Sequence, residues 1–154
     1  MKLTIIKLGI LNLNACIKLD QKSLKGLWTK SQWEKELTDP KRICIGAIDL
    51  KTKKLLGVCS SWLIIDEIHI TSIAVDPSHQ GKGIGTILLS DLIKHSNSLQ
   101  ATQIYLEVKD TNEAAKAFYK SRGFKREGSR SNFYNDGSDA IIFIKKLTNK
   151  SSKE

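Results

Sequence analysis

A glycine-rich segment carries the strongest chemical signal in the sequence. It reads Val75-Asp76-Pro77-Ser78-His79-Gln80-Gly81-Lys82-Gly83-Ile84-Gly85-Thr86 and lies between a predicted strand and a predicted helix. Glycines let backbone N–H groups approach an anion closely, and the N-terminus of a helix adds a partial positive charge. Lys82 adds a full positive charge. We therefore expect this segment to bind a phosphate or diphosphate group.

Two common phosphate-binding patterns do not fit this segment. The Walker pattern needs its lysine after the last glycine, whereas Lys82 precedes Gly83 and Gly85. The dinucleotide-binding fingerprint needs a glycine where Thr86 stands. A purely structural glycine turn is the alternative, but the strand before it, the helix after it and the lysine within it favour an anion site.

Glu107 could exchange a proton with a substrate. It alternates with the apolar Leu106 and Val108, so its side chain is expected on the opposite face of the strand. A carboxylate in such a strand acts either as a general base or as an ion-pair partner. The residues alone favour the ion pair.

Tyr119 is the second candidate for proton exchange. It follows Asn112 by seven residues, two helical turns, and the small Ala115 lies between them on the same helical face. The hydroxyl could protonate a leaving group, and Asn112 could hydrogen-bond an extended ligand. The alternative is that Tyr119 is a core aromatic packed beside Phe118.

Composition limits the size and class of the protein. The chain has 154 residues, of which 40% are hydrophobic, which is enough for one self-supporting domain. We predict a single domain over residues 1–147 and a disordered tail over residues 148–154. The net charge of +9 suits anionic partners such as nucleotide phosphates, although a solvated basic surface explains it equally well.

The cysteines and the N-terminus bear on location. Cys16, Cys44 and Cys59 are odd in number and widely spaced, which argues against a disulfide framework and a zinc site. Neither a signal peptide nor a long apolar run is visible. His69, His79 and His95 lack metal-ligand spacing, so we expect no metal. We therefore expect a cytoplasmic protein that does not enter membranes and needs no direct contact with nucleic acid.

Hydrophobic periodicity predicts the elements that position these residues. Period-two patterns predict strands, and patterns with apolar residues three and four apart predict helices. Two capping boxes, Ser31 with Glu34 and Asp110 with Glu113, are expected to begin helices, and Gly123 is expected to end one. The predicted strands are 3–7, 43–47, 55–64, 68–75, 103–108, 125–128 and 140–146, and the predicted helices are 11–24, 31–37, 84–95 and 112–121. This order predicts a mixed α/β sheet with one parallel crossover at its centre.

These motifs resemble those of the GNAT superfamily of N-acetyltransferases. Gln80-x-x-Gly83-x-Gly85, preceded by Ile73–Pro77, is similar to the acyl-coenzyme A binding motif of that family. The segment Leu106–Phe124 is similar to the second half of its fold. The resemblance implies a mostly antiparallel sheet of about seven strands with a central parallel pair and about four helices.

The late segment resembles one branch, the bacterial ribosomal-protein-alanine N-acetyltransferases. Asn132-Phe133-Tyr134 and Asp139–Ile142 carry this resemblance. The chain departs from the branch at Leu27-Trp28-Thr29, where the branch has Pro-Trp-Ser, and at Tyr134-Asn135, where it has Tyr-Pro. Both departures lie near the expected acceptor site.

The resemblance assigns roles residue by residue. It implies that Glu107 is the general base and Tyr119 the general acid. It implies acetyl-coenzyme A as co-substrate and the N-terminal α-amine of a small-subunit ribosomal protein as acceptor. Weaker candidates for acceptor contacts are Trp28, Glu67 and Tyr134. The residues expected to bind coenzyme A are Ile73, Ala74, Val75, Gln80, Gly81, Lys82, Gly83, Ile84, Gly85, Thr86, Asn112 and Tyr119.

Two other functions fit the same residues. The chain could acetylate a small amine such as a polyamine, an antibiotic or an amino acid, with Asp66 and Glu67 as the acidic contacts. It could also be a non-catalytic acyl-coenzyme A binding module, although the presence of both Glu107 and Tyr119 argues against this. We expect a monomer, because no apolar element is left without a partner.

Overall fold

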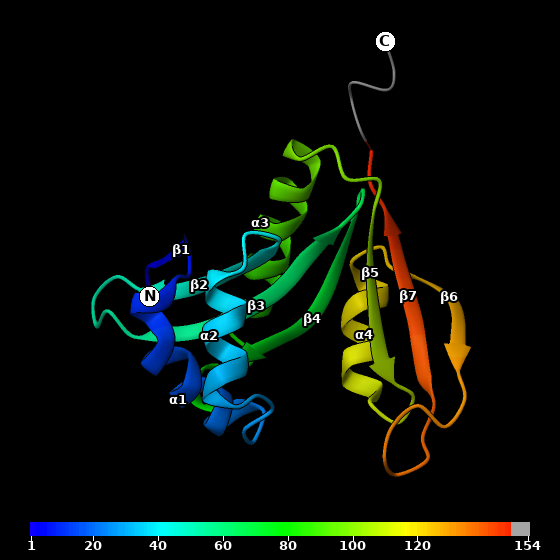
Figure 1. The fold of residues 1–154 in the computed structure, drawn as a ribbon, viewed down its shortest axis with the longest axis horizontal. Helices are drawn as coiled ribbons and strands as arrows, with labels where there is room; N and C mark the ends of the chain where they lie inside the picture. Colours follow the sequence, from blue (N-terminus) through cyan, green and yellow to red (C-terminus); the bar gives the residue numbers. More distant parts are fainter. Residues whose placement is uncertain (149–154) are drawn as a thin grey trace. The chain divides into compact units, whose positions relative to one another are not determined.

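In the computed structural model, residues 1–148 are described, and all statements below concern them. The elements appear in Figure 1 with the labels used here. In chain order they are β1 (Leu3–Lys7), a 3-10 turn (Ile10–Asn12), α1 (Leu13–Ser23), α2 (Lys30–Thr38), β2 (Arg42–Asp49), β3 (Leu55–Ile64), β4 (Glu67–Val75), a 3-10 turn (Pro77–His79), α3 (Ile84–Ser98), β5 (Gln103–Lys109), α4 (Glu113–Ser121), β6 (Lys125–Arg130) and β7 (Ala140–Lys146).

The strands form one seven-stranded sheet in the order β1-β2-β3-β4-β5-β7-β6. β4 and β5 pair in parallel through Glu67–His69 and Gln103–Tyr105. The pairs β1–β2, β2–β3, β5–β7 and β6–β7 are antiparallel. This topology confirms the predicted fold class, a mixed sheet with a central parallel pair.

The chain divides into two compact units. Unit 1 contains Met1–Leu63 and Ile70–His95, and unit 2 contains Ile64–His69 and the chain from Ser96 onward. The single domain over residues 1–147 stays a prediction. Of the tail predicted to be disordered, residues 149–154 lie outside the described part of the chain.

In unit 1, helices pack on both faces of the sheet, because successive side chains of β3 point to opposite sides. Val58 belongs to the core under α1 and α2. Its neighbour Gly57 points the other way, where a Cβ atom would lie 2.8 Å from Cγ2 of Ile84 in α3. The buried members of the core under α1 and α2 are Leu8, Cys16, Leu19, Trp33, Cys44, Val58 and Ala74.

In unit 2, β5 alternates as the sequence predicts. Ile104, Leu106 and Val108 are buried, whereas Tyr105 and Glu107 are partly exposed. One face of the strand is therefore apolar and the other carries the polar side chains.

The predicted helix end at Gly123 is confirmed. Its φ of +89° is left-handed, and its N–H donates to the Lys120 carbonyl at 3.2 Å. The N–H of Phe124 donates to the Tyr119 carbonyl at 3.1 Å. Together these bonds form a Schellman motif, and the rings of Phe124 and Tyr119 pack 5.4 Å apart across it.

Both predicted capping boxes were wrong, although α2 and α4 each begin within one residue of the predicted start. α2 begins at Lys30 with a capping box formed by Thr29 and Gln32, not by Ser31 and Glu34. The same short pattern fits both pairs, and the pattern alone cannot choose between them. α4 is capped by Asn112, whose Oδ1 accepts the N–H of Ala115 at 3.0 Å, and not by Asp110.

The three cysteines are buried, and none of them forms a disulfide bond, which agrees with the prediction from their number and spacing. Burial raises the thiol pKa of Cys16 and of Cys44 to about 12, and it also raises that of Cys59. These thiols therefore remain protonated in the folded chain at neutral pH. Among residues 1–148, no helix is long and apolar enough to cross a membrane.

Candidate active site

The predicted anion-binding segment lies in unit 1, between β4 and α3. Asp76 closes the turn after β4, because its Oδ1 accepts the backbone N–H of Ser78 at 2.9 Å and the hydroxyl of Ser78 at 2.7 Å. These hydrogen bonds, the hydroxyl first, lower the pKa of Asp76. The Asp76 carboxylate is therefore an acceptor for this turn and not a ligand for an anion.

The glycines leave space for an anion. Gly81 and Gly83 have φ angles of +79° and +82°, a backbone conformation that side chains disfavour. Apart from the glycine itself and its two chain neighbours, no heavy atom among the described residues lies within 4 Å of where a Cβ atom would stand at either position. α3 begins at the buried Ile84, so its N-terminal N–H groups follow the two glycines directly. This open backbone beside a helix start fits a diphosphate group.

The other predicted coenzyme A residues of unit 1 have separate environments. Lys82 is exposed, and Gly85 and Thr86 are partly exposed in the first turn of α3. Ala74 is a core residue, between the partly exposed Ile73 and Val75. The Val75 carbonyl accepts the Ser23 hydroxyl at 3.1 Å and the Gln80 side-chain amide at 3.5 Å. This carbonyl therefore already has two donors.

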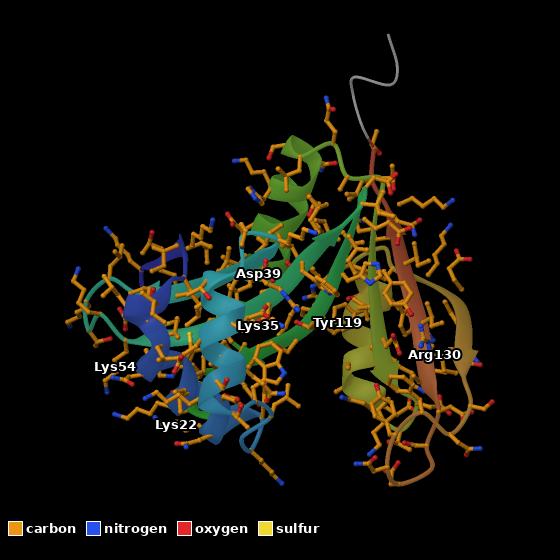
Figure 2. The ribbon with its side chains drawn as sticks, viewed as in Figure 1. Lys22, Lys35, Asp39, Lys54, Tyr119 and Arg130 are labelled. Carbon is orange, nitrogen blue, oxygen red and sulfur yellow. The ribbon has the colours of Figure 1, made fainter. Side chains whose placement is uncertain are left out.

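A basic cavity of about 380 Å³ also lies in unit 1, but it contains none of the predicted site residues. Lys18, Lys22, Lys53 and Lys54 line it together with Asp76. Lys22 and Lys54 are labelled in Figure 2. The Lys22 ammonium is 3.8 Å from the Asp76 carboxylate.

Glu107 lies in unit 2, on the polar face of β5. Its Oε1 accepts the hydroxyl of Tyr105 at 3.0 Å, and its Oε2 lies 3.7 Å from Nε of Arg130. Figure 2 shows Arg130 beside the strands of unit 2. The guanidinium also donates to the Tyr105 hydroxyl at 3.4 Å. Glu107 is thus both an ion-pair partner and a base candidate, and the structure places it in a hydrogen-bonded cluster that the sequence did not predict.

Glu67, a weak candidate for acceptor binding, has both carboxylate oxygens engaged in unit 2. Oε1 lies 3.1 Å from Nε2 of His69, and Oε2 accepts the side-chain amide of Gln103 at 3.1 Å. An ionised carboxylate can only accept, so Nε2 of His69 carries the proton in this pair. The His69 ring stacks on Tyr105, with centroids 4.5 Å apart. His69, for which the sequence suggested no chemical role, therefore links Glu67 to the Glu107 cluster.

Tyr119 is largely buried in α4, at 9% exposure, and Figure 2 labels it there. Its ring packs edge-on against Phe118 at 5.1 Å and Phe124 at 5.4 Å. It is therefore a core aromatic that also carries a hydroxyl. Asn112 caps the helix from outside it, so its Oδ1 already accepts one hydrogen bond and its amide N–H groups could donate to a ligand.

The two aromatic candidates for acceptor contacts belong to different units. In unit 1, Trp28 packs edge-on against Trp33 with centroids 4.8 Å apart. In unit 2, Tyr134 lies in a turn, because its backbone carbonyl accepts the N–H of Gly137 at 2.9 Å. The Lys109 ammonium lies 5.7 Å from the centroid of the Tyr134 ring. Burial, and then the charge of Glu107, raise the pKa of the Tyr134 hydroxyl. Tyr134 is therefore within the electrostatic reach of Glu107.

Sequence reasoning missed Tyr105 and Arg130. Tyr105 precedes Glu107 by two residues and therefore shares its strand face, a signal that was available. Arg130 was not predictable, because β7 lies between β6 and β5. Among residues 1–148, no three His, Cys, Asp or Glu side chains gather into a group that could hold a metal.

Residues 9–124 match the model of the Acetyltransferase (GNAT) family. The chain therefore belongs to this family and is an N-acetyltransferase. It is 35% identical to the N-alpha-acetyltransferase RimI of Mycobacterium tuberculosis over 118 residues, which are 73% of this chain and 72% of that one. It is 38% identical to the ribosomal protein bS18-alanine N-acetyltransferase of Escherichia coli K12 over 92 residues, 58% of this chain and 62% of that one.

Solved structures agree with these sequence matches. The crystal structure of the ribosomal-protein-S18-alanine N-acetyltransferase from Escherichia coli superimposes with a TM-score of 0.87 and 28% sequence identity. The match covers 96% of this chain and 95% of that chain. The similarity to the family and its ribosomal-protein-alanine branch, inferred from the motifs, is confirmed.

Proposed function

We propose that this chain transfers the acetyl group of acetyl-coenzyme A to the N-terminal α-amine, an alanine, of a small-subunit ribosomal protein. Membership of the acetyltransferase family supports the reaction class. The acceptor is supported by the similarity to the Escherichia coli protein whose name is ribosomal protein bS18-alanine N-acetyltransferase. The observation that carries the proposal is the carboxylate of Glu107, which the strand β5 holds on its polar face.

The proposed reaction needs one base and one acid. Glu107 takes a proton from the acceptor ammonium, and the freed amine attacks the thioester carbonyl carbon. A C–N bond forms, the C–S bond breaks, and the thiolate takes the hydroxyl proton of Tyr119. The attacking nitrogen loses its second proton to water as the amide forms, and a proton from water restores the Tyr119 hydroxyl. The open backbone at Gly81 and Gly83, with Lys82 and the start of α3, binds the diphosphate.

Acid–base chemistry favours an α-amine over a lysine. An α-amine titrates at about 7.7–8.0 and a lysine at about 10.4. At pH 7 roughly a tenth of α-amines are neutral, but under about a thousandth of lysine side chains are. A single glutamate therefore matches a chain N-terminus better. We expect the protein to act in the cytoplasm as a monomer, without membrane binding and without requiring direct contact with nucleic acid.

The test is acetyl transfer to a peptide with the N-terminal sequence of ribosomal protein bS18. A second peptide has the same sequence with its N-terminus blocked and its lysines free, and intact mass reports both. We expect one acetyl group on the free N-terminus only. Modification of polyamines or free amino acids instead of the peptide would establish a small-amine enzyme. Binding of coenzyme A without any transfer would establish a non-catalytic module.

Glu107→Gln tests the base. We expect kcat/KM to fall by about 10²- to 10⁴-fold, the usual contribution of a general base. Glu127→Gln is the matched control, because Glu127 is an exposed carboxylate on β6 of the same unit. Equal loss in both variants would show a general charge effect, and full activity of Glu107→Gln would remove the base assignment.

A further inference from the structure

The two oxygens of the Glu107 carboxylate differ in their partners. Oε1 accepts the Tyr105 hydroxyl at 3.0 Å. Oε2 is buried and makes no hydrogen bond within residues 1–148, and its nearest charge is Nε of Arg130 at 3.7 Å. One oxygen is therefore fixed by a donor, while the other has no hydrogen-bond donor among the described residues.

A buried oxygen without a donor is costly. Leaving a buried acceptor unsatisfied lowers the stability of the fold, so folded proteins seldom retain one without a reason. A carboxylate that accepts a proton needs such a lone pair. The missing donor at Oε2 therefore shows that the hydrogen bonding of the Glu107 carboxylate is incomplete among the described residues, although the side chain is partly exposed.

Tyr105 keeps its hydroxyl proton and donates it to the carboxylate. Burial first, and then the hydrogen bond to Glu107 and its negative charge, raise the pKa of the Tyr105 hydroxyl. Arg130 donates to the same hydroxyl oxygen at 3.4 Å, and its charge opposes that rise. A hydroxyl that accepts from a cation becomes a stronger donor, so the chain Arg130–Tyr105–Glu107 is cooperative.

The Tyr105 ring is fixed by its neighbour on β4. His69 and Tyr105 are partners in the parallel β4–β5 register, and their rings stack at 4.5 Å with 26° between the planes. Glu67 holds His69 by a 3.1 Å contact, and Gln103 holds Glu67. The tyrosine can therefore present its hydroxyl to Oε1 with little freedom to rotate.

We propose that Tyr105 is a positioning residue for the general base. Its hydroxyl, supported by Arg130 and by the His69 stack, holds Oε1 of Glu107 and so fixes the orientation of the carboxylate that takes the proton of the acceptor amine. This inference rests on the proposed function, in which Glu107 is the base. Tyr105 itself does not touch the substrate in this scheme, and no proton passes through it.

The kinetic test is Tyr105→Phe, which removes the hydroxyl and keeps the ring on His69. We expect kcat for peptide acetylation to fall roughly 10- to 100-fold, as for other groups that orient a reacting side chain, while KM for the peptide changes less than about 3-fold. Thr102→Val is the control, because it removes a hydroxyl that bonds the Asp66 carbonyl just before β5. An unchanged kcat in Tyr105→Phe, with Glu107→Gln impaired, would overturn this inference alone.

A double variant tests whether Tyr105 acts through Glu107. In the Glu107→Gln background, we expect Tyr105→Phe to cause no further loss of kcat, because the two changes remove one function. Multiplicative losses in the double variant would mean that Tyr105 acts elsewhere. Full activity of Glu107→Gln would instead reject the base and the proposed mechanism.

A titration gives a readout that does not need activity. Tyr105 faces Glu107 on its own strand, Arg130 on β6 and His69 on β4. The difference in phenolate absorbance between chains with and without Tyr105 isolates this residue from the other two tyrosines. We expect its titration midpoint to fall in the Glu107→Gln background, because the negative charge that raises the pKa is gone. An unchanged midpoint would overturn the Tyr105–Glu107 coupling whatever the acceptor is.

Discussion

The indole of Trp33 donates a 2.8 Å hydrogen bond to the carboxylate of Asp20, and both residues are almost fully buried. The same carboxylate accepts the backbone N–H groups of Leu27 at 2.8 Å and Trp28 at 3.0 Å. One buried acid of α1 therefore fixes α2 and the connection before it. That connection carries Trp28, the predicted acceptor contact of unit 1.

Asp20→Ala removes the acceptor for three donors at once. We expect the free energy of unfolding to fall by about 3–5 kcal/mol, because each buried donor left without a partner costs about 1–3 kcal/mol and the site relaxes in part. Urea denaturation measures this loss. Trp33→Phe keeps the aromatic ring and removes one of the three bonds, so we expect a smaller loss, about 1–2 kcal/mol. Equal stability of Asp20→Ala and wild type would contradict the role given to this carboxylate.

Gly83→Ala separates the backbone role of the glycine loop from its role in ligand binding. The left-handed φ of +82° makes alanine cost about 1–2 kcal/mol of stability, with no steric clash, because the space around the Cβ position is empty. We expect acetyl-coenzyme A affinity to fall by more than about 10-fold, because the methyl group occupies the space that a phosphate needs.

Gly26→Ala is the matched control for Gly83→Ala. Gly26 lies in the same unit, with φ of +77° and equally open surroundings. It should lose similar stability and keep its affinity for acetyl-coenzyme A, measured by calorimetry. Similar affinity losses in both variants would show that the glycine loop has no special part in binding.

Periodicity was sufficient to predict most of the fold. The strands predicted over 55–64 and 140–146 are β3 and β7, with the ends that the structure has. The capping box of α2 was predicted wrongly, because Thr29-x-x-Gln32 and Ser31-x-x-Glu34 both match the capping-box pattern. The pair that forms the box lies next to a tertiary contact, because the Asp20 carboxylate accepts the backbone N–H groups of Leu27 and Trp28, just before Thr29.

The site was only partly predictable for a topological reason. The alternation in β5 placed Glu107 on the polar face correctly, because that depends on local geometry. The partner Arg130 comes from β6, which β7 separates from β5. The small Ala140 of β7 is the register partner of both Lys109 and Arg130. No local pattern specifies which strand inserts between two others.

Tyr119→Phe tests the proposed acid. The ring packs between Phe118 and Phe124, so we expect the variant to keep its fold within about 1 kcal/mol. If the hydroxyl protonates the thiolate, kcat should fall by about 10²-fold or more while KM for acetyl-coenzyme A stays nearly constant. A rise in KM with unchanged kcat would assign Tyr119 to binding, and no change in either would leave it a core aromatic.

Glu36 predicts a pH dependence of stability that is separate from catalysis. This carboxyl of α2 is 5% exposed, and burial raises its pKa from 4.5 to about 7, although the positive charge of Arg42, 3.3 Å away, opposes the rise. A carboxyl with a raised pKa binds its proton more tightly in the folded chain. It therefore makes the fold less stable as pH rises from about 4.5 to about 7.

Glu36→Gln should remove that pH dependence, because the amide stays neutral at every pH. We expect the difference in unfolding free energy between Glu36→Gln and wild type to move by roughly 2–3 kcal/mol in favour of the variant between pH 5 and pH 8. Urea denaturation across this range measures it. Glu34→Gln is the matched control, because it removes the same charge at an exposed position of the same helix. Parallel stability curves for Glu36→Gln and wild type would mean that Glu36 titrates in the folded chain as it does in the unfolded one, and that Arg42 fully offsets its burial.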